Sequence, residues 1–237
     1  MLGILKNIAD NRNTQSLSHR FRQRRFRIFL EMVRSLPKPI SILDIGGTLA
    51  FWEAMGFAEE GVSITLLNLE VQQQMKPGFM SIAGDATALD FDDQSFDIVF
   101  SNSVIEHLYT FEQQQKMATE VQRVGKTYFI QTPNYWFPIE PHWVFPFFQY
   151  LPFNWRVWLT QHFPLGHIPR QNERSEAERQ VREIRLMTKA ELQSIFPKAQ
   201  LYRERFLFFT KSFVMKKGRI RNEETRNREQ ESFKLQV

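Results

Sequence analysis

The chain contains no cysteine, which excludes disulfides, thiolate metal ligands and a cysteine nucleophile. It also has no uncharged run close to the roughly 18 to 20 residues that a bilayer-spanning helix needs. The segment Met1–Lys6 has no apolar core of signal-peptide length before Asp10. These absences predict a cytoplasmic protein, with peripheral contact to a membrane left open.

The length and composition of the chain are sufficient for a hydrophobic core. The chain has 237 residues, of which 42% are hydrophobic and 14% aromatic, so it can bury one large domain. We expect this single domain to span residues 1–215. Residues 216–237 are of mixed charge and poor in apolar side chains, and this composition predicts a disordered tail.

The net charge of +5 is concentrated near the amino terminus, where residues 1–40 hold nine Lys and Arg against two acidic residues. Apolar residues recur at helical spacing from Leu17 to Leu36, and Pro37 and Pro39 end the pattern. We therefore predict a basic helix that lies on a sheet. Its charged face is most simply solvated, and binding to anionic lipid or nucleic acid is the alternative.

A short apolar run, Ser41–Thr48, reads as a buried strand that stops at Gly46 and Gly47. Small residues at the carboxyl end of a strand leave bare backbone there, and open α/β sheets bind their ligands at this edge. We expect the chemistry to be organised around this stretch.

The remaining pattern alternates between strands and helices at short spacing. This alternation favours parallel strands joined by crossover helices, so we predict an α/β fold with a doubly wound, mostly parallel sheet. A capping box at Thr188–Glu191 opens a further helix, and two last strands are expected to form an antiparallel pair at one edge. The predicted strands are 63–69, 80–83, 96–102, 126–131, 200–209 and 212–215, and the predicted helices are 49–57, 111–124 and 188–196.

Aromatic residues gather in one segment, 135–163, which holds twelve of the thirty-three in the chain. Prolines interrupt this segment and exclude one long helix. We expect short turns that form an aromatic-rich cap insertion over the ligand edge, within residues 133–185. A membrane-facing surface, plain core and a dimer interface are the alternatives. Arg156 is the only Lys or Arg in the segment, which argues against nucleic acid as a partner.

Four short motifs follow one another at the ends of predicted strands: Leu43–Gly47, Leu66–Glu70, Gly84–Ala86, and Phe96–Val99 followed by Glu106–Leu108. Together they resemble class I S-adenosylmethionine-dependent methyltransferases, in particular the methyltransferase type 11 group, over roughly residues 40–134. The resemblance implies a Rossmann-like fold, S-adenosyl-L-methionine as cofactor and methyl transfer as the activity.

The cofactor carries a sulfonium, an amino-acid end, a ribose and an adenine, so its site needs bare backbone, several acceptors and an apolar slot. The expected cofactor-binding residues follow the four motifs. Those at the first strand would hold the amino-acid end, those at the second the ribose, those at the third the adenine, and those at the fourth the floor. They are Asp44, Gly46 and Gly47; Asn68 or Glu70; Asp85 and Ala86; and Ser101 and Asn102.

The sequence departs from the family pattern at two places. Thr48 and Ala50 stand where the family has its second and third glycines. Asn68 replaces the acid that binds the ribose, and Glu70, expected on the same strand face, could take over that role. A nicotinamide dinucleotide fold is the runner-up, but it would need glycines where Thr48 and Phe51 stand.

Methyl transfer to a hydroxyl needs a group that accepts a proton, and two histidines are candidates. His107 follows the fourth strand, and His142 follows the end of the fifth. Each could instead cap a helix or fill a polar gap. The sequence predicts no metal site, because His107, His142, His162 and His167 show no ligand spacing with carboxylates.

We expect the acceptor to be a small molecule or a lipid-like compound, with the acceptor atom and the oligomeric state left open. The second hypothesis, of another class, is a non-catalytic methyltransferase-like module that binds a membrane surface or a protein partner. Thr48, Ala50 and Asn68 motivate this alternative, together with the basic helix and the aromatic segment.

Overall fold

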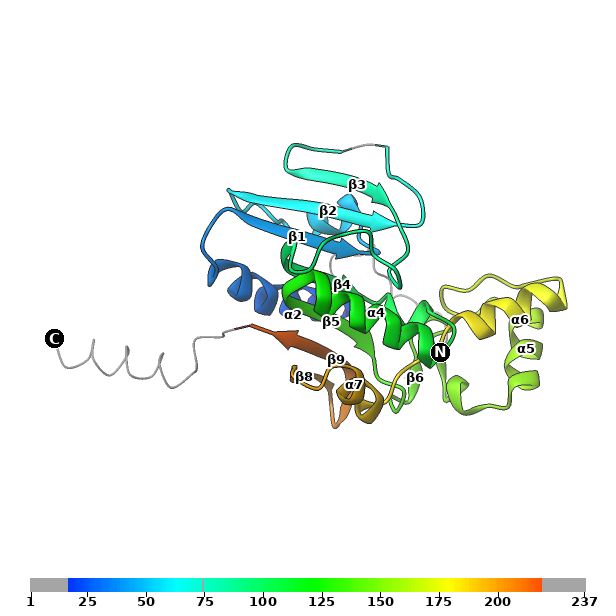
Figure 1. Cartoon of the computed structure of the whole chain (residues 1–237). Helices are drawn as coiled ribbons and strands as arrows, with labels where there is room; N and C mark the ends of the chain where they lie inside the picture. The colour runs from blue at the N-terminus through cyan, green and yellow to red at the C-terminus, as the bar shows by residue number, and fades with distance from the viewer. Residues whose placement is uncertain (1–16, 74, 219–237) are drawn as a thin grey trace.

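A computed structural model of the protein describes residues 17–73 and 75–218. Its centre is a seven-stranded sheet of order β3-β2-β1-β4-β5-β9-β8 (Figure 1). Every pairing among the first five strands is parallel, so their carboxyl ends meet at one edge of the sheet. These strands are β1 (Ile40–Ile45), β2 (Val62–Asn68), β3 (Phe79–Ala83), β4 (Phe96–Asn102) and β5 (Gly125–Pro133).

An antiparallel pair closes the sheet beyond β5. β8 (Gln200–Phe206) pairs with β9 (Phe209–Lys217), and β9 runs antiparallel to β5. The doubly wound fold with an antiparallel edge is therefore confirmed. β9 extends two residues into the segment predicted as a tail, because Lys216 and Lys217 continue the ladder with β5. Residues 219–237 of that segment, and residues 1–16 of the basic segment, lie outside the described residues.

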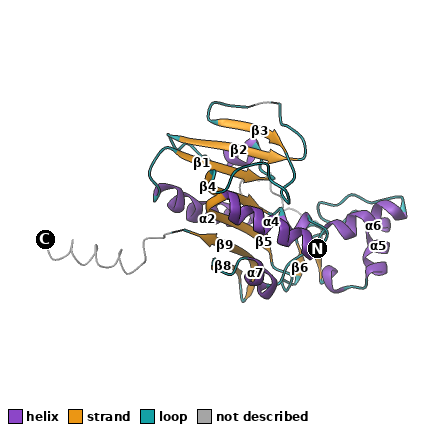
Figure 2. Ribbon diagram, in the orientation of Figure 1, coloured by secondary structure: helices purple, strands orange, loops and turns teal. Residues whose placement is uncertain are grey.

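Helices cover both faces of the sheet (Figure 2). One face packs against α2 and α3 in a cluster that includes Phe29 and Trp52, both buried. The other face packs against α4 and α7, where Met117 and Leu192 are fully buried. The four helices are α2 (Leu17–Arg34), α3 (Leu49–Ala54), α4 (Phe111–Val124) and α7 (Lys189–Ile195).

The predicted basic helix is α2, and it is not simply solvated. Its apolar residues meet the sheet, and Arg25 is buried with its guanidinium Nη1 2.7 Å from Glu204 Oε2 on β8. Along residues 17–73 and 75–218, no helix has both the length and the apolar character that crossing a bilayer demands.

The aromatic segment forms short elements, as its prolines predict. It contains the two-stranded hairpin of β6 (Ile139–Glu140) and β7 (Phe145–Pro146) and the helix α5 (Phe153–His162), and α6 (Arg174–Glu183) follows it in the chain. Figure 1 shows α5 and α6 projecting from the side of the sheet toward which the parallel strands run. A hydrophobic cluster of its own holds this cap together, with Trp143 stacked on Phe148 at 4.3 Å between ring centroids.

Candidate active site

The loop after β1 requires its two glycines for steric reasons. Gly46 has φ +73°, and a Cβ there would lie 2.4 Å from Val104 Cγ2. A Cβ on Gly47 would lie 1.7 Å from Asp44 Oδ2, which is an impossible approach. The backbone of this loop is therefore bare, as the sequence predicted, and it packs against the loop that leads from β4 to Glu106.

Thr48, the first departure from the glycine pattern, has a local structural role. It is the N-cap of α3, and its Oγ1 accepts a hydrogen bond from Phe51 N at 3.2 Å. An N-cap threonine satisfies a backbone donor that would otherwise be unpaired at the helix start. The loop keeps its turn without the second glycine because α3 begins directly at that position.

Asp44 is buried below this loop with half of its carboxylate unpaired. Its Oδ2 accepts from Trp52 Nε1 at 2.7 Å, whereas its Oδ1 has no hydrogen-bond partner among the described residues. Burial raises the pKa of Asp44 to about 8, although the Trp52 hydrogen bond opposes this shift. A cationic donor within hydrogen-bond distance would stabilise the charged form of this carboxylate.

Asp44 lines a small cavity of about 200 Å³ at the ends of β1 and β4. The cavity contains several of the predicted cofactor residues and three that the sequence did not indicate. The predicted residues in its lining are Asp44, Gly46, Gly47 and Asn102, and the additional ones are Arg22, Phe51 and Phe100, with Thr48 completing the wall.

At the end of β2, where the sequence predicts the ribose site, a hydrogen-bond network joins β2 to the glycine loop. Asn68 Nδ2 and Gln72 Nε2 both donate to the carbonyl of Gly47, each at 2.8 Å. The argument that placed Glu70 on the face of Asn68 is wrong, because β2 ends at Asn68 and strand alternation stops there. Glu70 is exposed just beyond the strand end. The sequence did not indicate Gln72, because a glutamine in a loop belongs to no recognisable motif.

Three further predicted residues have defined surroundings. Asp85 is exposed and its Oδ1 accepts from Thr87 N and Oγ1, each at 2.8 Å. Ala86 packs against the core cluster on the α4 face. Ser101 is not part of the cavity floor, because it is fully buried and its Oγ donates to Ile45 O at 3.2 Å, joining β4 to β1.

The structure brings the two candidate histidines together. The rings of His107 and His142 are perpendicular, with centroids 5.0 Å apart. His142 Nδ1 lies 2.7 Å from Glu140 Oε1, and His107 Nδ1 lies 3.4 Å from Glu183 Oε1. Burial disfavours a charged His142, but the carboxylate of Glu140 outweighs this effect and raises its pKa.

Between these histidines lies Glu106, which is fully buried in the short helix η1 (Ile105–His107). Its Oε2 accepts from Thr132 Oγ1 at 2.9 Å, and its Oε1 has no hydrogen-bond partner among the described residues. Burial raises the pKa of Glu106, whereas His107 and His142 act to lower it. Sequence spacing gave no sign of this cluster, because the β6–β7 hairpin that supplies His142 reaches it only through the fold.

Comparison with known proteins agrees with the geometry of this sheet edge. The model of the methyltransferase domain family matches residues 45–128, which run from the end of β1 into β5. This segment matches a methyltransferase domain. The cofactor of this family is S-adenosylmethionine.

Relatives by sequence are more distant. An uncharacterised protein of Mycobacterium tuberculosis, found in two strains, is 28% identical over 130 residues, covering 50% of this chain and 44% of the relative. The chain therefore spans less than half the length of the curated relatives it matches.

Two solved structures are similar to this methyltransferase domain and its surroundings. One is a SAM-dependent methyltransferase from Methanosarcina mazei, with TM-score 0.49, 15% identity, and coverage of 81% of this chain and 97% of that chain. The other is a SAM-dependent methyltransferase from Aquifex aeolicus, with TM-score 0.47, 13% identity, and coverage of 91% and 97%.

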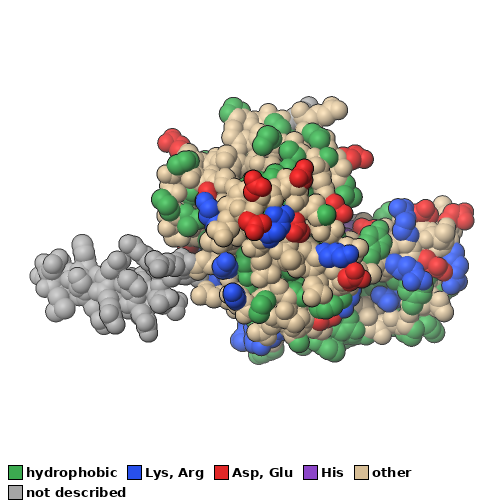
Figure 3. Space-filling model, in the orientation of Figure 1, with side chains coloured by type: hydrophobic (Ala, Val, Ile, Leu, Met, Phe, Trp, Pro, Cys, Tyr) green, Lys and Arg blue, Asp and Glu red, His purple; other side chains and the backbone are tan. Residues whose placement is uncertain are grey.

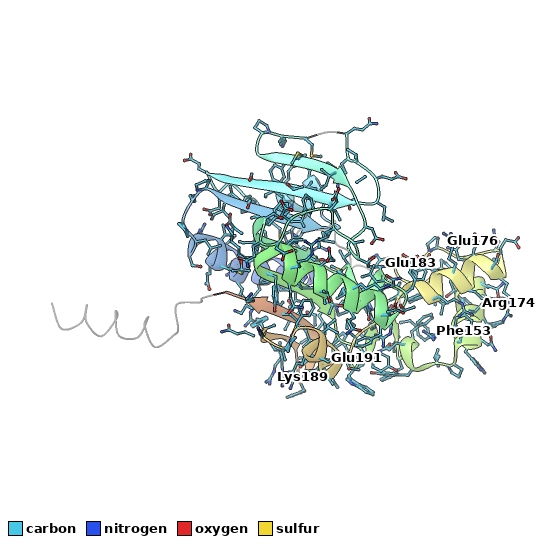
Figure 4. The ribbon with its side chains drawn as sticks, in the orientation of Figure 1. Phe153, Arg174, Glu176, Glu183, Lys189 and Glu191 are labelled. Carbon is cyan, nitrogen blue, oxygen red and sulfur yellow. The ribbon has the colours of Figure 1, made fainter. Side chains whose placement is uncertain are left out.

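A second and larger cavity, of about 700 Å³, lies between the methyltransferase domain and the cap. Glu140, whose carboxylate is hydrogen-bonded to His142, is part of its wall, whereas His107, His142 and Glu106 are not among the lining residues. Aromatic and arginine side chains dominate the lining, among them Tyr109, Tyr135, Trp143, Phe148, Phe153, Arg156, Arg182 and Arg185. Figure 4 shows two cap residues, Phe153 on α5 and Glu183 at the end of α6 that lies near the sheet domain.

Proposed function

We propose that the chain binds S-adenosylmethionine at the carboxyl ends of β1 to β4 and transfers its methyl group to a small or lipid-like acceptor. The observation that carries this proposal is the buried, half-unpaired carboxylate of Asp44 beneath the bare Gly46–Gly47 backbone. Gly46 and Gly47 lie within the segment that matches the methyltransferase family, and Asp44 directly precedes that segment. The ammonium group of the cofactor would supply the hydrogen-bond donor and the positive charge that the free oxygen of Asp44 lacks.

The proposed cofactor pose follows the strand ends. The amino-acid end lies at Asp44 and the glycine loop, the ribose at Asn68 or Glu70, and the adenine at Asp85 and Ala86. Asn68 already uses its amide nitrogen to hold Gly47, so Glu70 is the stronger candidate for the ribose hydroxyls. Asn102 lines the small cavity and supports a position near the methyl group.

For the reaction itself, methyl transfer is an in-line displacement, so the protein must aim the acceptor at the methyl group and exclude water. His107 and His142 are the proposed residues that act on the acceptor, most simply by taking its proton. Their position supports this role, because Val104, two residues before Glu106, contacts Gly46 of the cofactor loop.

The larger cavity is the proposed acceptor site. Its volume of about 700 Å³ falls in the range of small-molecule pockets, roughly 300 to 1,000 Å³. Arg156 has a buried Nε without a hydrogen-bond partner among the described residues, and the guanidinium of Arg182 lies over the Phe153 ring at 4.4 Å. We propose that the acceptor has an apolar body and carries an anionic group.

Isothermal titration with S-adenosylmethionine and with its demethylated product tests the cofactor proposal. We expect one site per chain with a dissociation constant well below millimolar, and a loss of at least about tenfold in affinity for Gly47→Ala, whose Cβ collides with Asp44. Glu178→Gln, in an exposed ion pair on α6, is the matched control and should bind normally. No heat of binding at millimolar ligand would overturn the proposal.

The exposed aromatic side chains favour a second candidate function, a module that binds a membrane surface. Trp136, Phe147, Trp155, Trp158 and Phe163 are all largely solvent-exposed, and Figure 3 shows hydrophobic side chains gathered along the lower rim of the molecule, from α7 to the cap. Trp in such positions suits the membrane interface.

Co-sedimentation with anionic phospholipid vesicles tests this second candidate. If the surface binds lipid, Trp155→Ala combined with Trp158→Ala should lower the bound fraction severalfold, whereas Glu178→Gln should leave it unchanged. Absence of binding at low salt would remove the candidate.

A further inference from the structure

Three side chains of the kinds that hold metal ions meet where η1 approaches the β6–β7 hairpin. One ligand-type atom from each of Glu106, His107 and His142 lies within 4.8 Å of the other two. We propose that this cluster binds a divalent transition-metal ion, with Zn²⁺ as the best match. Two imidazoles and one carboxylate form a donor set that suits this ion.

The surroundings of both histidines support the assignment. A metal-bound histidine nearly always pairs its second ring nitrogen with a carboxylate or carbonyl, which fixes the tautomer and the ring orientation. His142 Nδ1 has Glu140 Oε1 at 2.7 Å, and His107 Nδ1 has Glu183 Oε1 at 3.4 Å. Glu140 is hydrogen-bonded to His142 and orients its ring, and Glu183 places a carboxylate beside Nδ1 of His107, so in both rings Nε2 is the nitrogen left to bind the ion.

Glu106 provides the independent observation. It is fully buried, its Oε2 is held by Thr132, and its Oε1 has no hydrogen-bond partner among the described residues. A buried carboxylate oxygen without a partner is costly, and a cation at this point would satisfy it. The perpendicular rings, with centroids 5.0 Å apart, suit two imidazoles that approach one ion at about 2.0 to 2.1 Å.

Three protein ligands leave a coordination position open, which is typical of catalytic rather than structural zinc. The fourth ligand would be water or the acceptor, and Glu140, which orients His142, also lines the larger cavity.

The chemical role of the fourth ligand rests on the proposed function. In this case the ion, and not the two histidines, would prepare the acceptor, because a hydroxyl bound to the ion through its oxygen would lose its proton to solvent more easily. The oxygen lone pair would form the new O–C bond as the C–S bond breaks, and the electron pair of the C–S bond would stay on the cofactor's sulfur.

Metal titration of the untagged, chelator-treated full chain tests the site without any cofactor or acceptor. We expect one Zn²⁺ per chain by calorimetry, and Co²⁺ as a probe should give the visible absorption of a four-coordinate site. His107→Ala and His142→Ala should each weaken Zn²⁺ binding at least about tenfold. His107 is only part-buried, which makes its variant the one least exposed to folding defects.

Two more variants distinguish the metal ligands from residues that do not bind the ion. Glu183→Gln keeps all three ligands but removes the carboxylate beside His107, so it should weaken binding by a smaller factor. His162→Ala is the matched control, because His162 is an exposed histidine on α5 whose Nδ1 donates to Trp158 O. Far-UV circular dichroism checks that each variant is folded.

The proposal is overturned if the wild-type chain binds no Zn²⁺ at micromolar concentration, or if His162→Ala loses binding while folded His107→Ala retains it. Either result leaves the histidines as proton acceptors. Zinc binding without S-adenosylmethionine binding would instead contradict the proposed function alone.

Discussion

Asp44 concentrates the chemistry of the cofactor loop in one side chain. Gly47 must lack a Cβ because of Asp44, Trp52 donates to it, and the small cavity opens onto it. A buried carboxylate with a raised pKa is unfavourable for folding at neutral pH, so the residue is better suited to ligand binding than to stability.

The pH dependence of stability follows from this residue. The pKa of Asp44 is about 8 in the folded chain against 3.8 ordinarily, so the stabilising protonation is complete at low pH. It is lost as the pH rises through about 4 to 8, at up to about 1.4 kcal/mol per pH unit. Asp44→Asn should therefore unfold at higher urea concentration than wild type near pH 8, with the difference vanishing near pH 4. Parallel pH profiles for the two proteins would contradict this assignment.

The contact between Gly47 and Asp44 makes a second prediction at this scale. Gly47→Ala should lower the free energy of unfolding by about 1 to 3 kcal/mol, because its methyl group collides with the buried carboxylate of Asp44. Combining it with Asp44→Ala removes the obstacle, so the double variant should be more stable than the sum of the two single effects. Strict additivity in urea unfolding would show that the collision is relieved elsewhere.

Among the elements, α2 is the one whose placement matters most for the cofactor edge. It brings Arg22 into the lining of the small cavity and joins β8 through the buried pair Arg25–Glu204. Glu204 Oε2 also accepts from Ser212 Oγ at 2.9 Å on β9. The basic helix is thus tied to the strand pair that closes the sheet.

Removing one member of that pair should be costly. Glu204→Gln leaves the buried guanidinium of Arg25 without its counter-charge, and we expect a loss of about 3 to 5 kcal/mol in the free energy of unfolding. Glu178→Gln breaks the exposed pair with Arg174 on α6 and should cost less than about 1 kcal/mol. Equal losses in denaturant unfolding would mean that the buried pair contributes no more than a surface one.

The same elements mark how far sequence reasoning reaches. Strand and helix periodicity, the Thr188–Glu191 capping box and the proline breaks are local signals, and the elements they predicted are present. The loop residues Gly46 and Gly47 were found because a strand that ends in glycine exposes backbone whatever lies around it. Arg22, Gln72 and the pairing of His107 with His142 depend on contacts between distant segments, so no local pattern could indicate them.

At the scale of the whole molecule, two cavities and one ionisable cluster lie in sequence from the sheet edge to the cap. The glycine loop contacts Val104, and Glu106 follows two residues later in η1. His142 is hydrogen-bonded to Glu140, and Glu140 lines the larger cavity. Under the proposed function, the cap would shape the acceptor site, and the ends of β1 to β4 would bind the donor.

A crystal structure with the demethylated cofactor bound tests this account most directly. We predict its amino group within hydrogen-bond distance of Asp44 Oδ1, its ribose at the end of β2 beside Glu70, and its sulfur directed toward Glu106, His107 and His142. Cofactor density in the larger cavity, or a pose that leaves Asp44 Oδ1 unpaired, would contradict it.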